Sequence, residues 1–527
     1  MAYTKSPVTS TYSTERLTLT PDLELLPGST DLAVEANGAM LNVLPFKEVD
    51  GTMYAQTRNA IRAYKVANSS MILRGAHVWQ KGSTIYYYVV VSDETNTYVY
   101  TATSPNGTWT VVNTLVTTST SPARFTEFID STNVKKLVMV DGVFGYVYTD
   151  NTSGTQITDS DFPTPHIPFP VFLDGYLFLA KSGTGDIYNS NLNDPALWTA
   201  GDFISSELYP DDIQALIKIN NYILAIGQNG SEYFYDAANA TASPLARYEG
   251  ASLPFGTVLP ESIAYNEDTV ILIANNNDGG FVFKLIEGFK HSDIPAITVT
   301  RAFGTEISAG MLSNAKTTRA YFIRQNGTLF YVFQFYQGQR NAQNNKATVY
   351  FSLSTKLWGL LQAGSSGAAY PIYYAGQAST SSIFTYVAGF DASSVFFGTL
   401  SASHSQDTFD GNTSQATNIK NEIRIPSVDF STMNVKTMHR LGIYYNRVGD
   451  SSGSNTAILV EWANDNRAAS YPFTGYLAGY ANYPGVGTVG FPFLTQLGQF
   501  RWRQFKLSTT GLTNWYFMEC DINKGQQ

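Results

Sequence analysis

The chain has 527 residues, more than one ordinary hydrophobic core accommodates, so a large architecture with at least one further unit is expected. Charged residues make up 14% of it and aromatic residues another 14%, a composition that excludes a disordered chain. The net charge of −9 at pH 7 disfavours a protein that coats nucleic acid with a basic surface, but it is compatible with a channel that repels DNA.

The cysteine content and the first residues bear on the compartment. Cys520 is the single cysteine, so no disulfide can form within the chain, as expected for a protein assembled in a reducing cytoplasm. Residues 1–7 contain no apolar run of the kind that a secretory signal requires. Residues 471–500 lack charge, but their prolines and glycines exclude a membrane helix.

Taken in chain order, the sequence shows short alternating runs of apolar and polar residues bounded by Gly, Asn or Asp, with almost no helical periodicity. From about residue 70 onward these runs recur with a spacing of about 45 residues, which suits four-stranded propeller blades. Turn signals such as Asn326-Gly327 separate strands within a group. We therefore predict an all-β fold with a β-propeller of roughly six to eight blades. The groups lie at residues 85–115, 136–149, 170–189, 213–236, 261–285, 319–353 and 369–400.

The composition changes after the last group. Residues 401–418 are rich in Ser, Asn, Gln and Asp, which predicts a linker. Further strand patterns predict a separate, sandwich-like β module at residues 422–430, 440–445, 457–462, 500–508 and 515–522. The expected domains are an N-terminal arm (1–45) that packs with the C-terminal module, a propeller (46–405), a linker (406–419) and a C-terminal platform (420–527).

Charge divides unequally between these units. Residues 420–527 hold ten Lys and Arg against seven Asp and Glu, which leaves 23 basic and 35 acidic residues in the remainder. Chance explains a small local excess of this kind. The alternative is that the C-terminal module meets an acidic neighbour.

No arrangement suited to metal binding or phosphate binding emerges from the sequence. Histidine occurs five times with no metal-binding spacing, one cysteine cannot build a zinc site, and no phosphate-binding loop is present. The histidines are His77, His166, His291, His404 and His439. We expect no cofactor.

Two short segments resemble parts of sialidases, which are propeller enzymes. Residues 104–109 resemble an Asp-box without its aspartate, and Arg424-Ile425-Pro426 lies far beyond the blades. We interpret the first as a hairpin turn and the second as part of a strand. Because neither a nucleophile nor a suitably placed carboxylate pair supports hydrolysis, the sequence predicts a protein without enzymatic activity.

The most specific signals lie in the third and fourth groups and near the C-terminal end. Residues 187–203 combine a strand with Asn-Asp-Pro, a tryptophan and Asp-Phe, and residues 207–234 continue with an acidic turn and two strands. Residues 500–507 form a basic and aromatic run. These segments resemble the packaged-DNA stabilisation proteins of podovirus-type phages, also called tail hub or nozzle proteins.

The resemblance implies a structural subunit of a short-tailed phage tail. Six subunits would form a ring below the portal and its adaptor, extend the DNA channel, retain packaged DNA and support genome ejection. The implied partners are the portal-adaptor protein, a tail needle, and fibre or tailspike proteins, while double-stranded DNA passes through the lumen without sequence-specific binding. The implied location is the virion tail, assembled in the host cytoplasm. The alternative is a carbohydrate-binding or carbohydrate-active propeller.

Two sets of residues are candidates for these roles. The first is a blade motif with a structural role, in which the tryptophan is buried against a neighbouring blade: Asn193, Asp194, Pro195, Trp198, Asp202 and Phe203. The second is a subunit or adaptor interface, because Arg and aromatic side chains are enriched at protein interfaces: Arg440, Phe500, Arg501, Trp502, Arg503 and Lys506. The alternative for the second set is a strand with solvated arginines. Residues 471–500 are expected to add a second contact.

Overall fold

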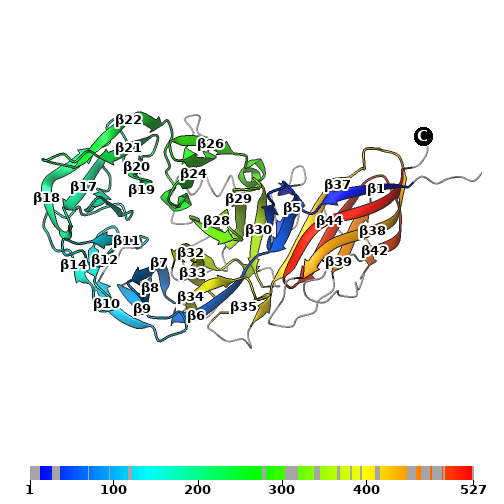
Figure 1. The fold of residues 1–527 in the computed structure, drawn as a ribbon, viewed down its shortest axis with the longest axis horizontal. Helices are drawn as coiled ribbons and strands as arrows, with labels where there is room; N and C mark the ends of the chain where they lie inside the picture. The colour runs from blue at the N-terminus through cyan, green and yellow to red at the C-terminus, as the bar shows by residue number, and fades with distance from the viewer. Residues whose placement is uncertain are drawn as a thin grey trace, which may run out of the picture.

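The computed structural model is almost entirely β, which confirms the predicted fold class (Figure 1). It describes residues 12–25, 36–68, 70–93, 95–116, 121–275, 281–302, 318–336, 345–364, 368–379, 383–391, 394–409, 416–447, 458–464, 475–477, 489–490 and 493–524. Helix within these ranges is limited to the 3-10 turn η1 (Pro260–Ser262) and a short stretch at residues 297–302. None of the helices described is long and apolar enough to cross a membrane.

Most of the chain forms a ring of four-stranded antiparallel blades, as predicted (Figure 1). Five blades follow one another along the chain. They are β7 (Ile72–Lys81), β8 (Thr84–Ser92), β9 (Asn96–Ala102) and β10 (Thr110–Val116); β11 (Arg124–Ile129), β12 (Lys135–Val140), β13 (Gly145–Tyr148) and β14 (Thr155–Gln156); β15 (Val171–Leu173), β16 (Tyr176–Ala180), β17 (Asp186–Asn191) and β18 (Asp194–Ser205); β19 (Ala215–Ile219), β20 (Tyr222–Ile226), β21 (Ser231–Asp236) and β22 (Leu245–Leu253); and β23 (Ala264–Tyr265), β24 (Thr269–Asn275), β25 (Phe281–Glu287) and β26 (Lys290–Ile294).

Two further groups of four strands close the ring. One contains β27 (Thr318–Gln325), β28 (Thr328–Tyr336), β29 (Asn345–Ser352) and β30 (Trp358–Ala363). The other joins β32 (Ile372–Ser379), β33 (Ile383–Phe390) and β34 (Ser394–Ser401) to the much earlier strand β6 (Ala60–Asn68). The ring is therefore closed by pairing between distant parts of the chain.

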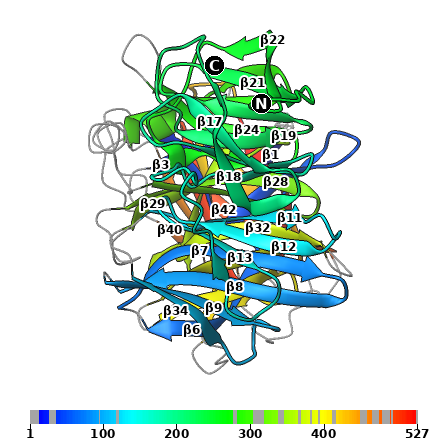
Figure 2. The ribbon, with the colours of Figure 1, turned by 90° about the vertical axis from the view of Figure 1, so that its left-hand side faces the viewer.

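The first strand of each blade lies toward the ring's centre, where first strands of neighbouring blades contact one another. Figure 2 faces the outer side of the ring, with β8 and β9 below and β21 and β22 above. Strands next to the inner one are apolar on both faces, because blades cover them on both sides. In residues 270–274 of β24, for example, every side chain is at most 1% exposed. Such continuous apolar runs are typical of fully buried strands.

Turn residues fit the tight connections within blades. Asn326 and Gly327 both have positive φ, 49° and 78°, in the two-residue turn between β27 and β28. This is the turn that the Asn-Gly pair predicts, because both positions require left-handed backbone.

The two ends of the chain build a module beside the ring from two packed sheets (Figure 1). One sheet has seven strands: β1 (Ser13–Thr18), β4 (Val43–Lys47), β5 (Met53–Thr57), β38 (Lys436–Arg447), β41 (Val489–Gly490), β42 (Phe493–Phe500) and β44 (Thr513–Asn523). The other contains β2 (Glu24–Leu25), β3 (Ala36–Leu41), β37 (Lys420–Val428), β39 (Leu459–Asn464), β40 (Gly475–Leu477) and β43 (Arg503–Thr510). Three further strands of the described chain are short: β31 (Ala368–Ala369), β35 (Gln406–Asp407) and β36 (Thr417–Asn418).

The ring and the end module share a sheet. β3 pairs with β30 of the ring in parallel and with β37 of the module in the opposite sense, so β27–β30 continue into an 11-stranded sheet. The boundary predicted at residue 46 falls inside β4, whose sheet belongs to the module, and the strands of the ring begin with β6. A shared sheet makes the connection a continuous hydrogen-bonded structure.

Candidate functional site

Trp198, the centre of the predicted blade motif, is 4% exposed and lies between two blades. Its indole packs edge-on against Phe162, with ring centroids 5.3 Å apart, in a cluster that includes Phe128 of β11. The indole Nε1 donates a hydrogen bond to the Pro195 carbonyl at 3.0 Å, and the Trp198 amide donates to an Asp159 carboxylate oxygen at 3.1 Å. Both N–H donors of this buried residue are thus satisfied.

The other motif residues surround the turn between β17 and β18. Asn193 has a φ of 57°, and its carbonyl accepts a hydrogen bond from the Ser131 amide of the neighbouring blade at 3.2 Å. The Asp194 side chain accepts the Ala196 amide at 2.9 Å, and strand β18 begins at Asp194, one residue before the proline. Phe203 is different: it is 38% exposed and stacks on Tyr188 at a centroid distance of 5.1 Å.

The residues predicted as a subunit or adaptor interface differ in their burial. Phe500 is 1% exposed and Arg503 is fully buried, so neither can contact an adaptor or a neighbouring subunit, and their prediction as interface residues is wrong. The Arg503 guanidinium donates to the Asn464 side chain at 2.7 Å and to the Leu497 carbonyl at 2.8 Å. It also lies 4.1 Å from the Phe500 ring centroid. Arg503 therefore stabilises the module from within.

The reason for the error is a change of sheet. The sequence predicts one strand over 500–508, but β42 ends at Phe500 in the seven-stranded sheet, and β43 starts at Arg503 in the other sheet. Residues 501 and 502 form the bend between the sheets, so the alternation expected for a single strand does not apply. Arg501 is exposed at this bend and Trp502 is half-buried.

Lys506 and Arg440 are held by acidic partners within the chain. The Lys506 ammonium lies 2.9 Å from Glu461 and 3.9 Å from Glu422. Burial alone raises the pKa of Glu422, but the nearby cations, Arg424 first, outweigh it and lower that pKa. Arg440 pairs with an aspartate on β44 at 2.7 Å, and its side chain is 40% exposed.

Much of the segment predicted as a second contact, 471–500, lies outside the described residues. The parts that are described form β40, β41 and β42 at residues 475–477, 489–490 and 493–500.

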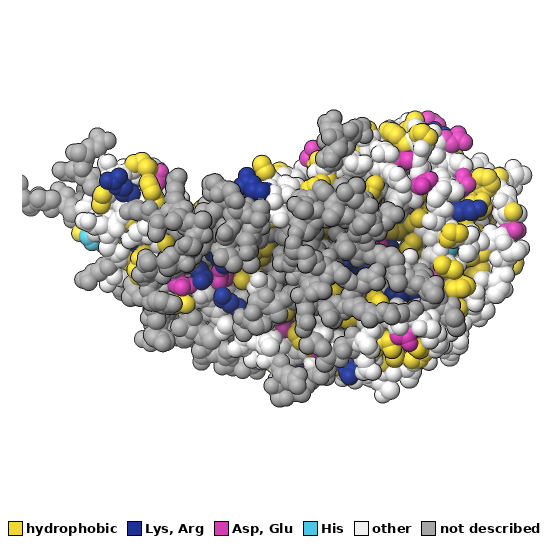
Figure 3. Space-filling view, turned by 180° about the vertical axis from the view of Figure 1, so that it is seen from behind, with side chains coloured by type: hydrophobic (Ala, Val, Ile, Leu, Met, Phe, Trp, Pro, Cys, Tyr) yellow, Lys and Arg dark blue, Asp and Glu magenta, His cyan; other side chains and the backbone are white. Residues whose placement is uncertain are grey.

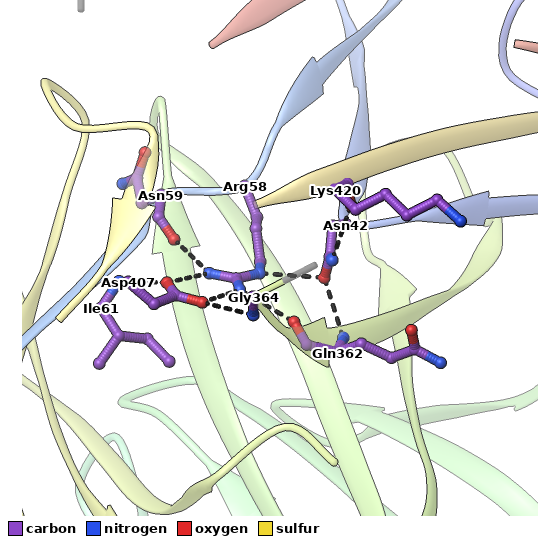
Figure 4. A network of polar contacts seen from close by, with 8 residues as sticks. All are labelled: Asn42, Arg58, Asn59, Ile61, Gln362, Gly364, Asp407 and Lys420. Atoms are coloured by element: carbon purple, nitrogen blue, oxygen red, sulfur yellow. Dashed lines mark hydrogen bonds and ion pairs between the residues drawn. The ribbon is translucent and has the colours of Figure 1, made fainter. Parts of the chain in front are cut away.

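A buried polar network joins the ring to the end module, and sequence analysis missed it (Figure 4). The Arg58 guanidinium and the Asp407 carboxylate form a two-pronged ion pair at 2.9 and 2.5 Å, with side chains that are 1% and 0% exposed. The remaining Arg58 donors reach the side chain of Asn42 and the carbonyls of Asn59 and Gln362 at 2.9–3.0 Å. All five donors of the guanidinium are therefore used.

The two charged residues organise segments that are far apart in sequence. Asp407 also accepts the amides of Ile61 and Gly364, at 2.9 and 3.1 Å. Burial lowers the pKa of Arg58, but the Asp407 carboxylate more than offsets this and raises it above its ordinary value. Asp407 lies in the stretch that composition predicts to be a linker. A single acid among Ser, Asn and Gln gives no local signal for burial.

Two of the histidines lie in the ring, where His166 is buried and His77 is half-buried. Burial lowers the pKa of both His77 and His166 to about 4, so both are neutral at pH 7. The ring of His166 accepts the Gly142 amide at Nε2 at 3.2 Å, and its Nδ1 lies 2.9 Å from the Pro163 carbonyl. Within the described ranges, no three His, Cys, Asp or Glu side chains are grouped as metal ligands would be.

The buried neutral His166 predicts acid sensitivity. Because its pKa falls from 6.5 unfolded to about 4 folded, the unfolded chain binds more protons between these values. Stability is therefore complete above pH 6.5 and is lost as the pH falls toward 4, by about 3 kcal/mol from this residue. His166→Gln, which keeps an acceptor near Nε2 but does not titrate, is expected to reduce that loss in denaturant unfolding measured from pH 7 to 4. His291→Gln at an exposed histidine is the control, and equal pH profiles for all three proteins would contradict the assignment.

Of the two sialidase-like segments, one forms a connection between strands and the other is part of a strand. Trp109 donates from its indole to the Pro105 carbonyl at 3.3 Å, within the connection between β9 and β10. Arg424 lies on β37 of the end module, outside the ring, and pairs with Glu422 at 2.5 Å. The two segments therefore do not form a common site.

Comparison with known proteins gives one family. The family model described as "Phage_stabilise: Bacteriophage P22 Gp10, beta-propeller" matches residues 40–370. No curated protein matches the sequence.

The solved structures that were matched are only weakly similar to this chain. An exo-β-1,3-galactanase from Phanerochaete chrysosporium with galactose is 10% identical at a TM-score of 0.27, covering 94% of this chain and 100% of the enzyme. YCF48 bound to D1 peptide is 11% identical at 0.38, covering 65% and 97%. A catalytically inactive virginiamycin B lyase from Staphylococcus aureus with quinupristin is 11% identical at 0.36, covering 65% and 98%. Likenesses this low say nothing about what the chain binds.

Proposed function

The chain belongs to the phage stabilisation family described as Bacteriophage P22 Gp10, beta-propeller, and from this premise we propose that it is a hub or nozzle subunit of a short-tailed phage tail. In this role it extends the DNA channel below the adaptor, retains packaged DNA and supports genome ejection. The observation that carries the proposal is the family match over residues 40–370, which includes most of the ring.

Rigidity supports a mechanical role. The ring is closed by pairing of β34 with β6. One of its sheets, β27–β30, continues into the end module through β3. The Arg58–Asp407 pair fixes the same junction by side-chain bonds. A subunit held in this way keeps a fixed geometry, and repeated head-to-tail contacts between such subunits close into a ring when the rotation closes. We propose a hexamer.

The charge of the chain suits a channel that DNA passes without being held. Net charge is −9, and Figure 3 shows acidic side chains gathered along the edge of the ring at the upper right of the view. Tight DNA binding requires a surface rich in Lys and Arg, which a strongly acidic chain opposes.

The end module is the part that we propose docks on the adaptor. Of the residues predicted for this contact, Arg501 is exposed and Arg440 is half-buried. Trp502, at the bend between β42 and β43, is also half-buried. These lie outside the ring, which leaves the ring free to contact a needle, fibres or tailspikes. Arginine and tryptophan are both enriched at the centres of protein interfaces.

The test is complementation of particles that lack this chain. Heads made without it are expected to package DNA and then lose it, and purified chain is expected to restore stable, infectious particles. The measurement is the fraction of full heads after gradient sedimentation. Arg501→Glu should restore fewer particles than the parent, while its melting temperature is unchanged.

Lys135→Glu, at a 51% exposed lysine on β12 of the ring, is the matched control and should complement fully. Particles that keep their DNA without the chain would refute the role in retention. Full complementation by Arg501→Glu would refute only the proposed contact.

A further inference from the structure

An open groove of about 850 Å³ lies on the ring, between the β19–β22 blade and the β23–β26 blade. Two tight turns border it, residues 220–221 between β19 and β20 and residues 266–268 between β23 and β24. The Asn220 amide donates to the Glu267 carbonyl at 3.0 Å and ties the turns together. Strands β20 and β24 lie in the upper part of the ring in Figure 1. The side chains that carry the argument from the lining are Lys218, Asn221, Tyr222, Tyr265 and Glu267.

Exposed aromatic rings gather around this groove. Tyr265 is 46% exposed at its wall, and Tyr222 lines it as well. The Tyr222 ring centroid lies 4.9 Å from that of Phe289, which is 42% exposed and stacks on Tyr248 at 5.1 Å. Tyr235, which is 37% exposed, lies 6.5 Å from Tyr222 in the same cluster. Three of the five exposed aromatic side chains in the described ranges therefore lie around one groove.

Such a cluster of rings calls for an explanation beyond packing within the chain. An exposed ring loses the stabilisation that burial of its apolar surface gives, and a patch of exposed apolar surface usually marks a site of binding. The rings come from different elements: Tyr222 begins β20, Tyr265 ends β23, and Phe289 lies in the turn between β25 and β26. Because paired strands fix each of these positions, the platform exists before a ligand arrives.

The polar side chains of the groove are open to a ligand. Lys218, Asn221 and Glu267 are exposed, and none of the three side chains makes a hydrogen bond or ion pair within the described part of the chain. Together they offer donors and acceptors of hydrogen bonds. One lysine and one glutamate are the charged residues among the described lining, so their formal charges cancel. This balance favours a ligand without net charge, because a charged one would meet a like charge at the wall.

From these observations we infer that the groove binds a neutral oligosaccharide. A hexose ring has apolar C–H faces and hydroxyl groups at its edge. The faces would cover Tyr265 and Phe289, and the hydroxyls would bond Asn221 and Glu267. The volume falls within the range of small-molecule sites, about 300–1,000 Å³, which combine aromatic walls with a few polar groups. The inference does not depend on the tail role, since the groove belongs to one subunit.

The test is calorimetric titration of the full chain with neutral trisaccharides, namely maltotriose, mannotriose, galactotriose and N-acetylchitotriose. At least one of them is expected to bind saturably at one site per chain. The anionic trigalacturonate is the comparison ligand and should bind more weakly than the best neutral one, because Glu267 repels it.

Two variants test the groove with the trisaccharide that binds best. Tyr265→Ala should weaken binding by about tenfold, because the apolar surface that the sugar covers is lost. Asn221→Ala should weaken it by about two- to tenfold, the effect of losing one neutral hydrogen bond. Asn221 is exposed in its turn, so this variant tests the site even if Tyr265→Ala melts early. The neighbouring Asn220 is left unchanged because its φ of 51° suits asparagine.

Phe203→Ala is the matched control. Phe203 is a 38% exposed aromatic residue that stacks on Tyr188 in another blade, so its loss should leave binding unchanged. Absence of binding by all four neutral trisaccharides, or binding that neither groove variant weakens, would overturn the proposal. Tighter binding of trigalacturonate than of every neutral trisaccharide would overturn the neutral class.

Discussion

Asp407→Asn is expected to lower the free energy of unfolding by about 3–5 kcal/mol, because it leaves the Arg58 guanidinium buried without its counter-charge. Arg58 is 1% exposed, and two of its five hydrogen bonds end on this carboxylate. The amides of Ile61 and Gly364 donate to different oxygens of the carboxylate. Because an asparagine side chain has only one oxygen, one of these two amides loses its acceptor. The measurement is equilibrium unfolding in denaturant, followed by both near- and far-ultraviolet circular dichroism.

The control for this change is an exposed ion pair in the same module. Arg16 and Glu519 lie 2.7 Å apart, but the Arg16 side chain is 62% exposed, so Arg16→Ala should cost less than about 1 kcal/mol. The ring and the module share a sheet, so we also expect Asp407→Asn to shift one common transition. A loss no greater than that of Arg16→Ala would show that the junction does not depend on this pair.

Trp198→Ala is expected to cost about 3–5 kcal/mol, the usual range for removing a large core aromatic. The indole fills the space between two blades beside Phe162 and also anchors the Pro195 carbonyl. Its loss leaves a cavity bounded by strands that are fixed in their own sheets and therefore close poorly around it. Thermal unfolding compared with the parent gives the measurement.

Leu197→Ala is the neighbouring control. Leu197 is 49% exposed on the same strand, so its truncation should change stability by no more than about 0.5 kcal/mol. If Trp198→Ala melted like Leu197→Ala, the tryptophan would not be part of the contact between blades.

Trp198 and the Arg58–Asp407 pair stabilise different contacts in the molecule. Trp198 fixes one blade against the next, whereas Arg58 and Asp407 fix the ring against the module that we propose meets the adaptor. The tail role that we propose, in which the chain holds DNA under load, requires both. Changes at either position should therefore reduce DNA retention in the complementation experiment even though neither lies at the proposed contact.

Local patterns in the sequence determined the fold class. Alternating strands, blade spacing and turn pairs such as Asn326-Gly327 depend on neighbouring residues, so an all-β ring with a further β module could be predicted. The burial of Trp198 also follows from its place beside a turn and a strand. The same patterns do not specify which distant strands pair. They gave no indication that β6 closes the last blade or that β3 joins the ring to the module.

Only the tertiary structure decided which charged residues are buried. A run of Phe, Arg, Trp and Arg has the same local pattern on a solvated strand as at a crossing between sheets, and only the crossing buries Arg503. Arg58 and Asp407 are separated by 349 positions and carry no local sign of their pairing. The physical reason is that the burial of a charge depends on which partners long-range packing brings within a few ångströms, whereas sequence patterns report only on nearest neighbours.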